Sequence, residues 1–124
     1  MDYTKFSCTF TVRRLLRDDI PSIFALCEKN PQFYEHCPPF VTPEKIEADM
    51  KAMPQRKAGQ EQDKYYLGYF DVHQRLVAVM DFIDHYPDAQ SGFIGFFMME
   101  KVLQGTGVGS SIITELCACL AQWD

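Results

Sequence analysis

Residues 104–110 read Gln104-Gly105-Thr106-Gly107-Val108-Gly109-Ser110, and they lie between an apolar stretch, Gly92–Met99, and a segment with helical periodicity. Three alternating glycines leave one side of the turn without side chains, so a ligand can touch the backbone there. The first N–H groups of a helix are unpaired, and the helix dipole makes that end electropositive. The segment therefore predicts a phosphate or pyrophosphate site, to which the hydroxyls of Thr106 and Ser110 add donors. The alternative is a glycine-rich turn that only lets the helix pack close to the sheet.

Two common glycine-rich motifs do not fit this segment. A Walker loop requires Lys followed by Ser or Thr after its last glycine, whereas Ser110 and Ser111 follow Gly109 here. A dinucleotide fingerprint requires a third glycine at the position of Ser110, and it requires a parallel strand–helix–strand unit. The strands that precede the segment have the pattern of antiparallel hairpins. Both nucleotide-binding motifs are therefore excluded.

Hydrophobic periodicity places the segment near the end of a short α/β chain. The predicted elements are a strand at 9–16, a helix from Asp18 to Asn30, an irregular stretch at Pro31–Val41, a helix from Thr42 to Pro54, a loop at Gln55–Asp63, strands at Tyr65–Val72, Leu76–Asp84 and Gly92–Met99, and a helix from Thr106 to the C-terminus. Pro38-Pro39 argues against a helix in the irregular stretch. The order is strand, two helices, three antiparallel strands and a helix, without internal repeats.

Length and composition restrict the class of protein. The chain has 124 residues, which is one domain (residues 1–124) with a modest core. Apolar residues make up 47% and charged residues 23%, with ten Phe and six Tyr, so the composition is that of a folded globular domain. Seventeen acidic against twelve basic residues give a net charge of −5, which argues against a nucleic-acid partner.

Targeting and cysteine patterns point to a reduced compartment. The longest uncharged run among the strands, Gly92–Met99, is far too short to span a bilayer, and no secretory signal is visible at the start. The five cysteines are odd in number and include no C-x-x-C, which disfavours both disulfides and a zinc site. We expect a cytoplasmic protein with no metal and no membrane partner.

The glycine segment together with the element order carries a family resemblance. Gln104-x-x-Gly107-x-Gly109 resembles the Q/R-x-x-G-x-G/A signature of the GCN5-related N-acetyltransferase family, which opens the third helix of that fold after its fourth strand. Three further segments are similar to ones common in bacterial members. They are Phe40-Val41-Thr42-Pro43, Asp81-Phe82-Ile83-Asp84 and Ile94-Gly95-Phe96-Phe97-Met98. The resemblance covers essentially the whole chain and implies a mixed α/β fold, mainly an antiparallel sheet with helices on both faces.

The resemblance also implies an activity: transfer of an acetyl group from acetyl-coenzyme A to a primary amine by direct attack. The pyrophosphate would bind the N–H groups from Gly105 to Ser110, and the pantetheine arm would pair with the strand end. One backbone N–H of that strand end would polarise the acetyl carbonyl. The implied cofactor-binding residues are Phe97, Met98, Met99, Gln104, Gly105, Thr106, Gly107, Val108, Gly109 and Ser110.

We expect the group that removes the amine proton to lie near the ends of the strands. The candidates are Asp84 and Glu100, with His85 interpreted as a turn residue. For both carboxylates the alternative is a solvated or hydrogen-bonded residue at a strand end. Asp81 and Asp84 lie three apart in one apolar strand and so point to opposite faces. One of the two therefore faces a packed side or a cleft, where a carboxylate needs a partner.

An aromatic cluster is the candidate acceptor site. Phe33, Tyr34 and Phe40 lie in the region that borders the acceptor pocket in the family, and aromatic rings suit an amine. The alternative is a loop held to the core by its aromatic side chains. The net charge of −5 favours a cationic small-molecule or peptide amine.

The resemblance is incomplete at the C-terminal side. The family continues beyond its third helix with a fifth strand, a fourth helix and a closing hairpin, whereas this sequence ends at Asp124. We expect a C-terminally truncated domain that associates with other copies of itself, because an uncovered strand edge tends to pair. The alternative explanation is a natural short form whose open edge is closed by another copy. The alternative function is a non-catalytic module that binds coenzyme A or phosphate, or an inactive fragment that acts through self-association.

Overall fold

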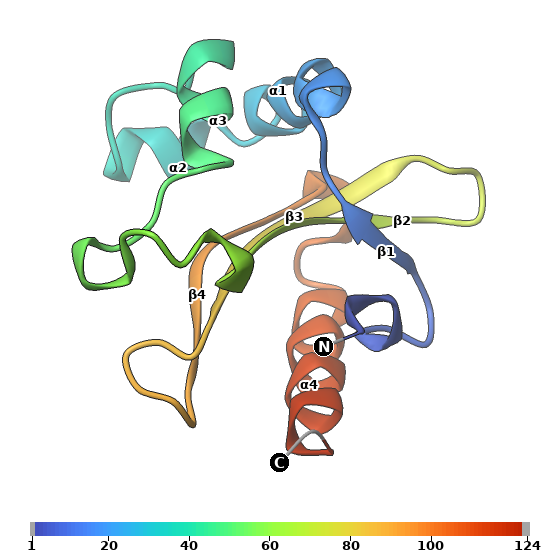
Figure 1. Cartoon of the computed structure of the whole chain (residues 1–124). Coiled ribbons are helices and arrows are strands. Elements are labelled where there is room, and N and C mark those ends of the chain that lie inside the picture. The colour runs from blue at the N-terminus through green and yellow to red at the C-terminus, as the bar shows by residue number, and fades with distance from the viewer. Residues whose placement is uncertain (1, 123–124) are drawn as a thin grey trace.

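The computed structural model describes residues 2–122, which form one antiparallel sheet with helices on both sides. The strands are β1 (Thr11–Arg14), β2 (Lys64–Phe70), β3 (Leu76–Asp84) and β4 (Gly92–Met99), in the spatial order β1-β2-β3-β4. The helices are α1 (Ile20–Glu28), α2 (Pro31–His36), α3 (Pro43–Asp49) and α4 (Val108–Ala121). Helices α1, α2 and α3 lie on one side of the sheet and α4 lies on the other (Figure 1). The predicted mixed α/β architecture is confirmed.

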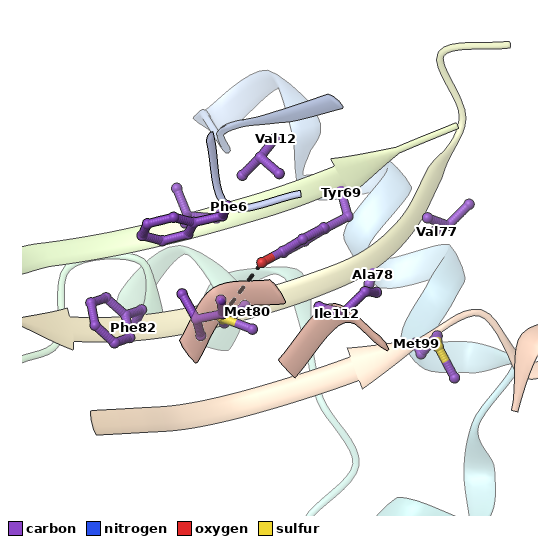
Figure 2. Packing of buried hydrophobic residues seen from close by; sticks show 11 residues of the cluster. Phe6, Val12, Tyr69, Val77, Ala78, Met80, Phe82, Met99 and Ile112 are labelled. Atoms are coloured by element: carbon purple, nitrogen blue, oxygen red, sulfur yellow. Dashed lines mark hydrogen bonds between the residues drawn. The ribbon is translucent and has the colours of Figure 1, made fainter. Parts of the chain in front are cut away.

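The core is divided into two clusters by the sheet, because successive side chains of a strand point to opposite faces. The cluster toward α4 contains Phe6, Val12, Leu67, Tyr69, Val77, Ala78, Met80, Phe82, Met99, Ile112 and Leu116. The cluster toward α1 and α3 contains Leu15, Ile20, Ile23, Leu26, Cys27, Ile46, Tyr66, Phe70, Val79 and Met98. Figure 2 shows the first cluster, in which the hydroxyl of Tyr69 donates to the sulfur of Met80 at 4.0 Å.

The structure corrects the prediction for the segment after α1. Residues 31–36 form the short helix α2, whereas the whole stretch Pro31–Val41 was expected to be irregular. Pro31 takes the first position of α2, where its missing N–H has no partner to lose. Pro38 and Pro39 come after the helix, so they break only the segment that follows it.

Smaller differences concern the ends of elements. Strand β1 is shorter than predicted because it pairs only with residues 67–70 of β2. The predicted loop at 55–63 contains two short 3₁₀ turns, Gln55–Lys57 and Glu61–Asp63. Helix α4 begins at Val108 and not at Thr106, because Gly107 has a left-handed conformation with φ of 87°. The end of this predicted helix, residues 123–124, lies outside the described residues.

No helix within residues 2–122 has both the length and the apolar character that are needed to cross a bilayer. In the same part of the chain, no three His, Cys, Asp or Glu side chains lie close enough together to hold a metal ion. All five cysteines are free thiols, of which Cys8, Cys37 and Cys117 are exposed.

Candidate functional site

The segment 104–110, here called the glycine loop, connects β4 to α4 and contains two left-handed residues. Gly105 has φ of 78° and Gly107 has φ of 87°, a conformation that L side chains rarely adopt. A Cβ placed on either glycine would meet no atom within 4 Å. These two positions therefore need glycine for their backbone conformation and not because of neighbouring side chains, and their surface is open to a ligand.

The N–H groups of this loop form a cup at the start of α4. Among residues 2–122, the N–H groups of Gly105, Gly107, Gly109 and Ser110 donate no hydrogen bond to the protein. The first intrahelical bond of the loop is donated by the N–H of Ser111 to the carbonyl of Gly107 at 3.0 Å. Unpaired donors at the positive end of a 14-residue helix have the arrangement that suits an anion.

Thr106 differs from its expected role as a side-chain donor. Its hydroxyl donates to the carbonyl of Leu103, so the hydrogen is used inside the turn. Its oxygen accepts the N–H of Val108 at 3.4 Å. Thr106 therefore shapes the cup, and the donors available to a ligand are backbone N–H groups.

Gln104 joins the loop to two other elements through its side chain. Its Nε2 donates to Asn30 Oδ1 at 2.5 Å and to the carbonyl of Met99 at 3.1 Å. Asn30, which is 7% exposed, donates to the carbonyls of Leu26 and Met99 at 2.9 and 3.3 Å. Asn30 was not predicted as a site residue, because its position before Pro31 in the sequence indicates only the end of a helix. The predicted cofactor residue Gln104 thus fixes the loop, and its side chain faces the protein.

The outer edge of β4 offers backbone groups to a ligand. The backbone N–H of Glu100 donates to the carbonyl of Val77 at 2.7 Å. This bond determines which residues of β4 hydrogen-bond to β3 and which point outward. In an antiparallel ladder the peptide groups of alternate residues point outward, so those of Phe97 and Met99 face away from β3. The Met99 carbonyl is taken by Asn30 and Gln104. The N–H and carbonyl of Phe97 and the N–H of Met99 remain for an added chain.

A cleft of about 640 Å³ runs beside this edge toward the glycine loop. Its lining residues are Asn30, Gln32, Phe33, Glu35, His36, Phe97, Met98, Met99, Lys101 and Gln104. This edge cleft brings four predicted cofactor residues together with Phe33, which was predicted to contact the acceptor. The cleft thus extends from Phe97 to Gln104, the residue that precedes the N–H cup.

Comparison with known proteins identifies the fold. No family model matches the sequence, and no curated protein matches it. An acetyltransferase from Thermus thermophilus superposes with a TM-score of 0.72 at 17% identity, covering 89% of this chain and 68% of its own. The PaiA N-acetyltransferase from Thermoplasma acidophilum, solved in complex with coenzyme A, gives 0.60 at 11% identity, with 92% and 73% covered. A GCN5-related N-acetyltransferase from Kribbella flavida gives 0.57 at 18% identity, with 92% and 66% covered.

The chain has the fold of the GCN5-related N-acetyltransferases. At these identities the likeness concerns the fold, and the chain spans about two thirds of the length of each neighbour. The glycine loop follows the fourth strand and opens the helix after it, as the sequence predicted.

The predicted acceptor residues do form a cluster in this acetyltransferase fold. The ring centroids of Phe33 and Tyr34 are 4.9 Å apart, and those of Tyr34 and Phe40 are 4.7 Å apart. They line a second cavity of about 380 Å³, here called the aromatic cavity, which also includes Phe96 and Tyr66. Burial raises the pKa of Tyr34, so its hydroxyl stays protonated at neutral pH. Phe33 lines both cavities, which therefore adjoin.

The structure does not bring Asp84 or Glu100 to these cavities. Asp84 pairs with Gly92, whereas Ala78, six residues earlier on β3, pairs with Met99. At about 3.4 Å per residue this places Asp84 roughly 20 Å from the strand end at Met99. Glu100 turns to Lys29, with 3.5 Å between Oε1 and Nζ, and lines a separate cavity. Asp84 and Glu100 have the contacts of strand-end residues, which was the alternative considered for them.

Asp81 instead forms a buried ion pair with Lys64 on the face covered by α1 and α3. Lys64 Nζ donates to Asp81 Oδ2 at 2.8 Å, and the two side chains are 6% and 14% exposed. Burial raises the pKa of Asp81, and the neighbouring Lys64 opposes that rise. The sequence indicated that Asp81 or Asp84 would need a partner, but it did not identify Lys64, which is the first residue of β2.

Proposed function

We propose that the chain is an acetyl-coenzyme A-dependent N-acetyltransferase that moves the acetyl group to a primary amine by direct attack, without a covalent enzyme intermediate. The single observation that supports this most is that the edge cleft reaches the glycine loop at Gln104, the residue immediately before the N–H cup. The outward N–H groups of Phe97 and Met99 lie along the cleft, and the free N–H groups of Gly105, Gly107, Gly109 and Ser110 follow Gln104. An acyl pantetheine diphosphate has the same order of groups: an extended amide chain followed by a pyrophosphate.

In this proposal the pyrophosphate accepts hydrogen bonds from the glycine loop, and the pantetheine amides pair with β4. The outward N–H of Phe97 donates to the acetyl carbonyl and stabilises the negative charge that develops on its oxygen. The amine enters beside Phe33, Tyr34 and Phe40, whose rings hold its body near the thioester. Lys101, which lines the edge cleft, adds a positive charge near the phosphates.

A second candidate function is a module that binds coenzyme A without turnover. The observation that favours it is the placement of Asp84 and Glu100, because neither predicted carboxylate reaches the cavities. Both candidate functions require the glycine loop to bind coenzyme A, and only the first includes transfer of the acetyl group.

The experiment is a calorimetric titration of acetyl-coenzyme A, followed by an assay of coenzyme A release with primary amines. Release is measured by chromatography, because the exposed thiols of Cys8, Cys37 and Cys117 would react with thiol reagents. The variant Gly107→Ala adds a methyl group in the cup and costs about 1–2 kcal/mol of backbone strain. We expect its affinity for acetyl-coenzyme A to fall more than tenfold.

Gly59→Ala is the matched control. Gly59 has φ of 85° and open space around its Cβ position, as Gly107 does, but it lies in the loop before β2. It carries the same backbone strain and should leave the affinity unchanged. Equal effects of the two substitutions, or no saturable binding to a folded wild-type chain, would contradict the assignment of the glycine loop. Binding without release of coenzyme A would favour the second candidate.

A further inference from the structure

Asp81 lies at the centre of a row of three residues across the sheet. The register pairs Tyr66 of β2 with Asp81 and pairs Asp81 with Phe96 of β4. Directly paired residues point to the same face of a sheet. Tyr66 and Phe96 both line the aromatic cavity. Asp81 therefore lies in the sheet between two residues that line the cavity that we propose for the amine, directly behind the cavity wall and not in it.

A bulge in β4 leaves the Asp81 carboxyl facing a residue without a side chain. Asp81 pairs with Phe96 and the next residue, Phe82, pairs with Ile94, so Gly95 is the extra residue on β4. A Cβ on Gly95 would lie 3.4 Å from Asp81 Oδ2, and Gly95 itself is exposed. Only a glycine therefore separates the buried carboxyl from the outer edge of β4.

One oxygen of the Asp81 carboxyl accepts a hydrogen bond and the other does not. Oδ2 accepts a hydrogen bond from Lys64 Nζ at 2.8 Å. Oδ1 is buried and lies 2.7 Å from the same nitrogen, but within residues 2–122 it accepts no hydrogen bond of good geometry. A buried carboxylate oxygen without a hydrogen bond lowers the stability of the fold, which indicates a functional role for it.

We propose that Asp81 is the proton acceptor for the amine, reached across Gly95 from the aromatic cavity; this assignment rests on the proposed function. Neither Asp84 nor Glu100 faces that cavity, whereas Asp81 lies on its face and beside the strand that would hold the thioester. Lys64 orients the carboxylate and opposes its protonation.

The step balances without any further reagent. The Asp81 carboxylate takes one proton from the ammonium group of the acceptor, and the nitrogen lone pair attacks the thioester carbon. The C–N bond forms and the C–S bond breaks. The leaving sulfur takes the second proton from nitrogen, which gives the amide and free coenzyme A, and Asp81 returns its proton to water.

The pH dependence follows from the groups that surround Asp81. Those that act on it or on its neighbour Tyr66 are Lys64 and Tyr66 of β2, Asp49 of α3, Tyr34 of α2 and Cys27 of α1. Burial raises the pKa of Asp81, Lys64 lowers it and the negative charge of Asp49 raises it. A raised pKa suits a base, because the proton then transfers more favourably. Activity should fall on the acidic side as Asp81 takes up a proton.

The test compares Asp81→Asn with the wild-type chain on 2-phenylethylamine, spermidine and a peptide with a free N-terminus. For the best of these substrates, we expect a loss of kcat of about 100-fold, with the Kd of acetyl-coenzyme A unchanged. The ratio of wild-type to variant activity should fall toward one near pH 10, where the amine is already neutral. A purely structural role would leave that ratio independent of pH. Asp18→Asn, the same change at an exposed site, should have no effect.

Gly95→Val provides a second variant in case Asp81→Asn, which leaves Lys64 buried without its partner, does not fold. It keeps the ion pair and fills the space beside Oδ2, so kcat should fall while acetyl-coenzyme A still binds. If the wild-type chain acetylates an amine and both folded variants keep its kcat, the Asp81 assignment is overturned and the proposed function stands. If the wild-type chain acetylates none of the three amines, the proposed function fails and the Asp81 assignment fails with it.

Discussion

Asn30→Asp tests the hydrogen-bond network that attaches the glycine loop to the fold. The substitution keeps the shape of the side chain and the acceptor for Gln104, but it removes the donor to the carbonyls of Leu26 and Met99. Asn30 is 7% exposed, so the introduced carboxyl has little water to compensate it. The change therefore removes two donated hydrogen bonds and introduces a carboxyl group in a site of nearly unchanged shape.

The expected loss of stability follows from the hydrogen bonds that Asn30 donates. Two hydrogen bonds at about 1 kcal/mol each give roughly 2 kcal/mol, and an ionised carboxylate beside two carbonyl oxygens adds on the order of 1 kcal/mol. We expect a loss of about 3 kcal/mol in the free energy of unfolding at pH 7, or roughly 10 °C in Tm for a domain of this size.

The destabilisation by Asn30→Asp should depend on pH, in a direction set by the pKa of the introduced carboxyl. Burial beside two carbonyls raises the pKa of the introduced carboxyl above its unfolded value of about 3.9. A protonated carboxyl can donate to one of the carbonyls, so the loss should be about 1 kcal/mol below pH 4 and should grow as pH rises through the folded pKa. Urea unfolding at several pH values measures this. The exposed Gln90→Glu, an equivalent change of amide to carboxylate, serves as the control. A loss under 0.5 kcal/mol, or one independent of pH, would refute the reasoning.

Three further predictions concern the stability of the fold. Leu116→Ala empties a site that is 1% exposed and should cost about 2–5 kcal/mol in urea unfolding, whereas Leu16→Ala, at 60% exposure, should cost under about 0.5 kcal/mol. Gly68→Ala places a Cβ within 2.6–2.9 Å of three side chains and should lower the free energy of unfolding by roughly 1–3 kcal/mol; an unchanged Tm would show that these side chains move away. The hydrogen bond from Arg13 lowers the pKa of Asp19, so its stabilisation is present at neutral pH and is lost as pH falls through the folded pKa. Asp19→Asn should reduce the fall in the free energy of unfolding at acidic pH. An unchanged fall would show that other groups cause it.

Local signals predicted most of the architecture. The alternation in β3 and β4 and the glycine spacing at 104–110 placed the strand, the cup and the start of α4 within about two residues. These features depend on neighbours in the sequence, on strand periodicity and on the conformational freedom of glycine. The cluster of Phe33, Tyr34 and Phe40 was also predicted, because a short aromatic segment cannot spread far.

The features that sequence reasoning missed depend on partners far along the chain. Asn30 meets Gln104 across 74 positions, and Lys64 meets Asp81 across 17 positions of a hairpin. Helix α2 was missed because Pro38 and Pro39 suggested an irregular segment, whereas a helix of six residues depends on packing against its surroundings. Which carboxylate faces a cavity is set by the sheet register, and one sequence does not supply the pairing.

The division of the core by the sheet implies an order of assembly during synthesis. Phe6 is fully buried, and its cluster includes Ile112 and Leu116, more than 100 positions later. The opposite cluster needs only residues 15–98. On the ribosome, the side under α1 and α3 can therefore close while α4 is still being made. The side that holds Phe6 must wait for the last helix, and until then it is the surface of the nascent chain most in need of protection from aggregation.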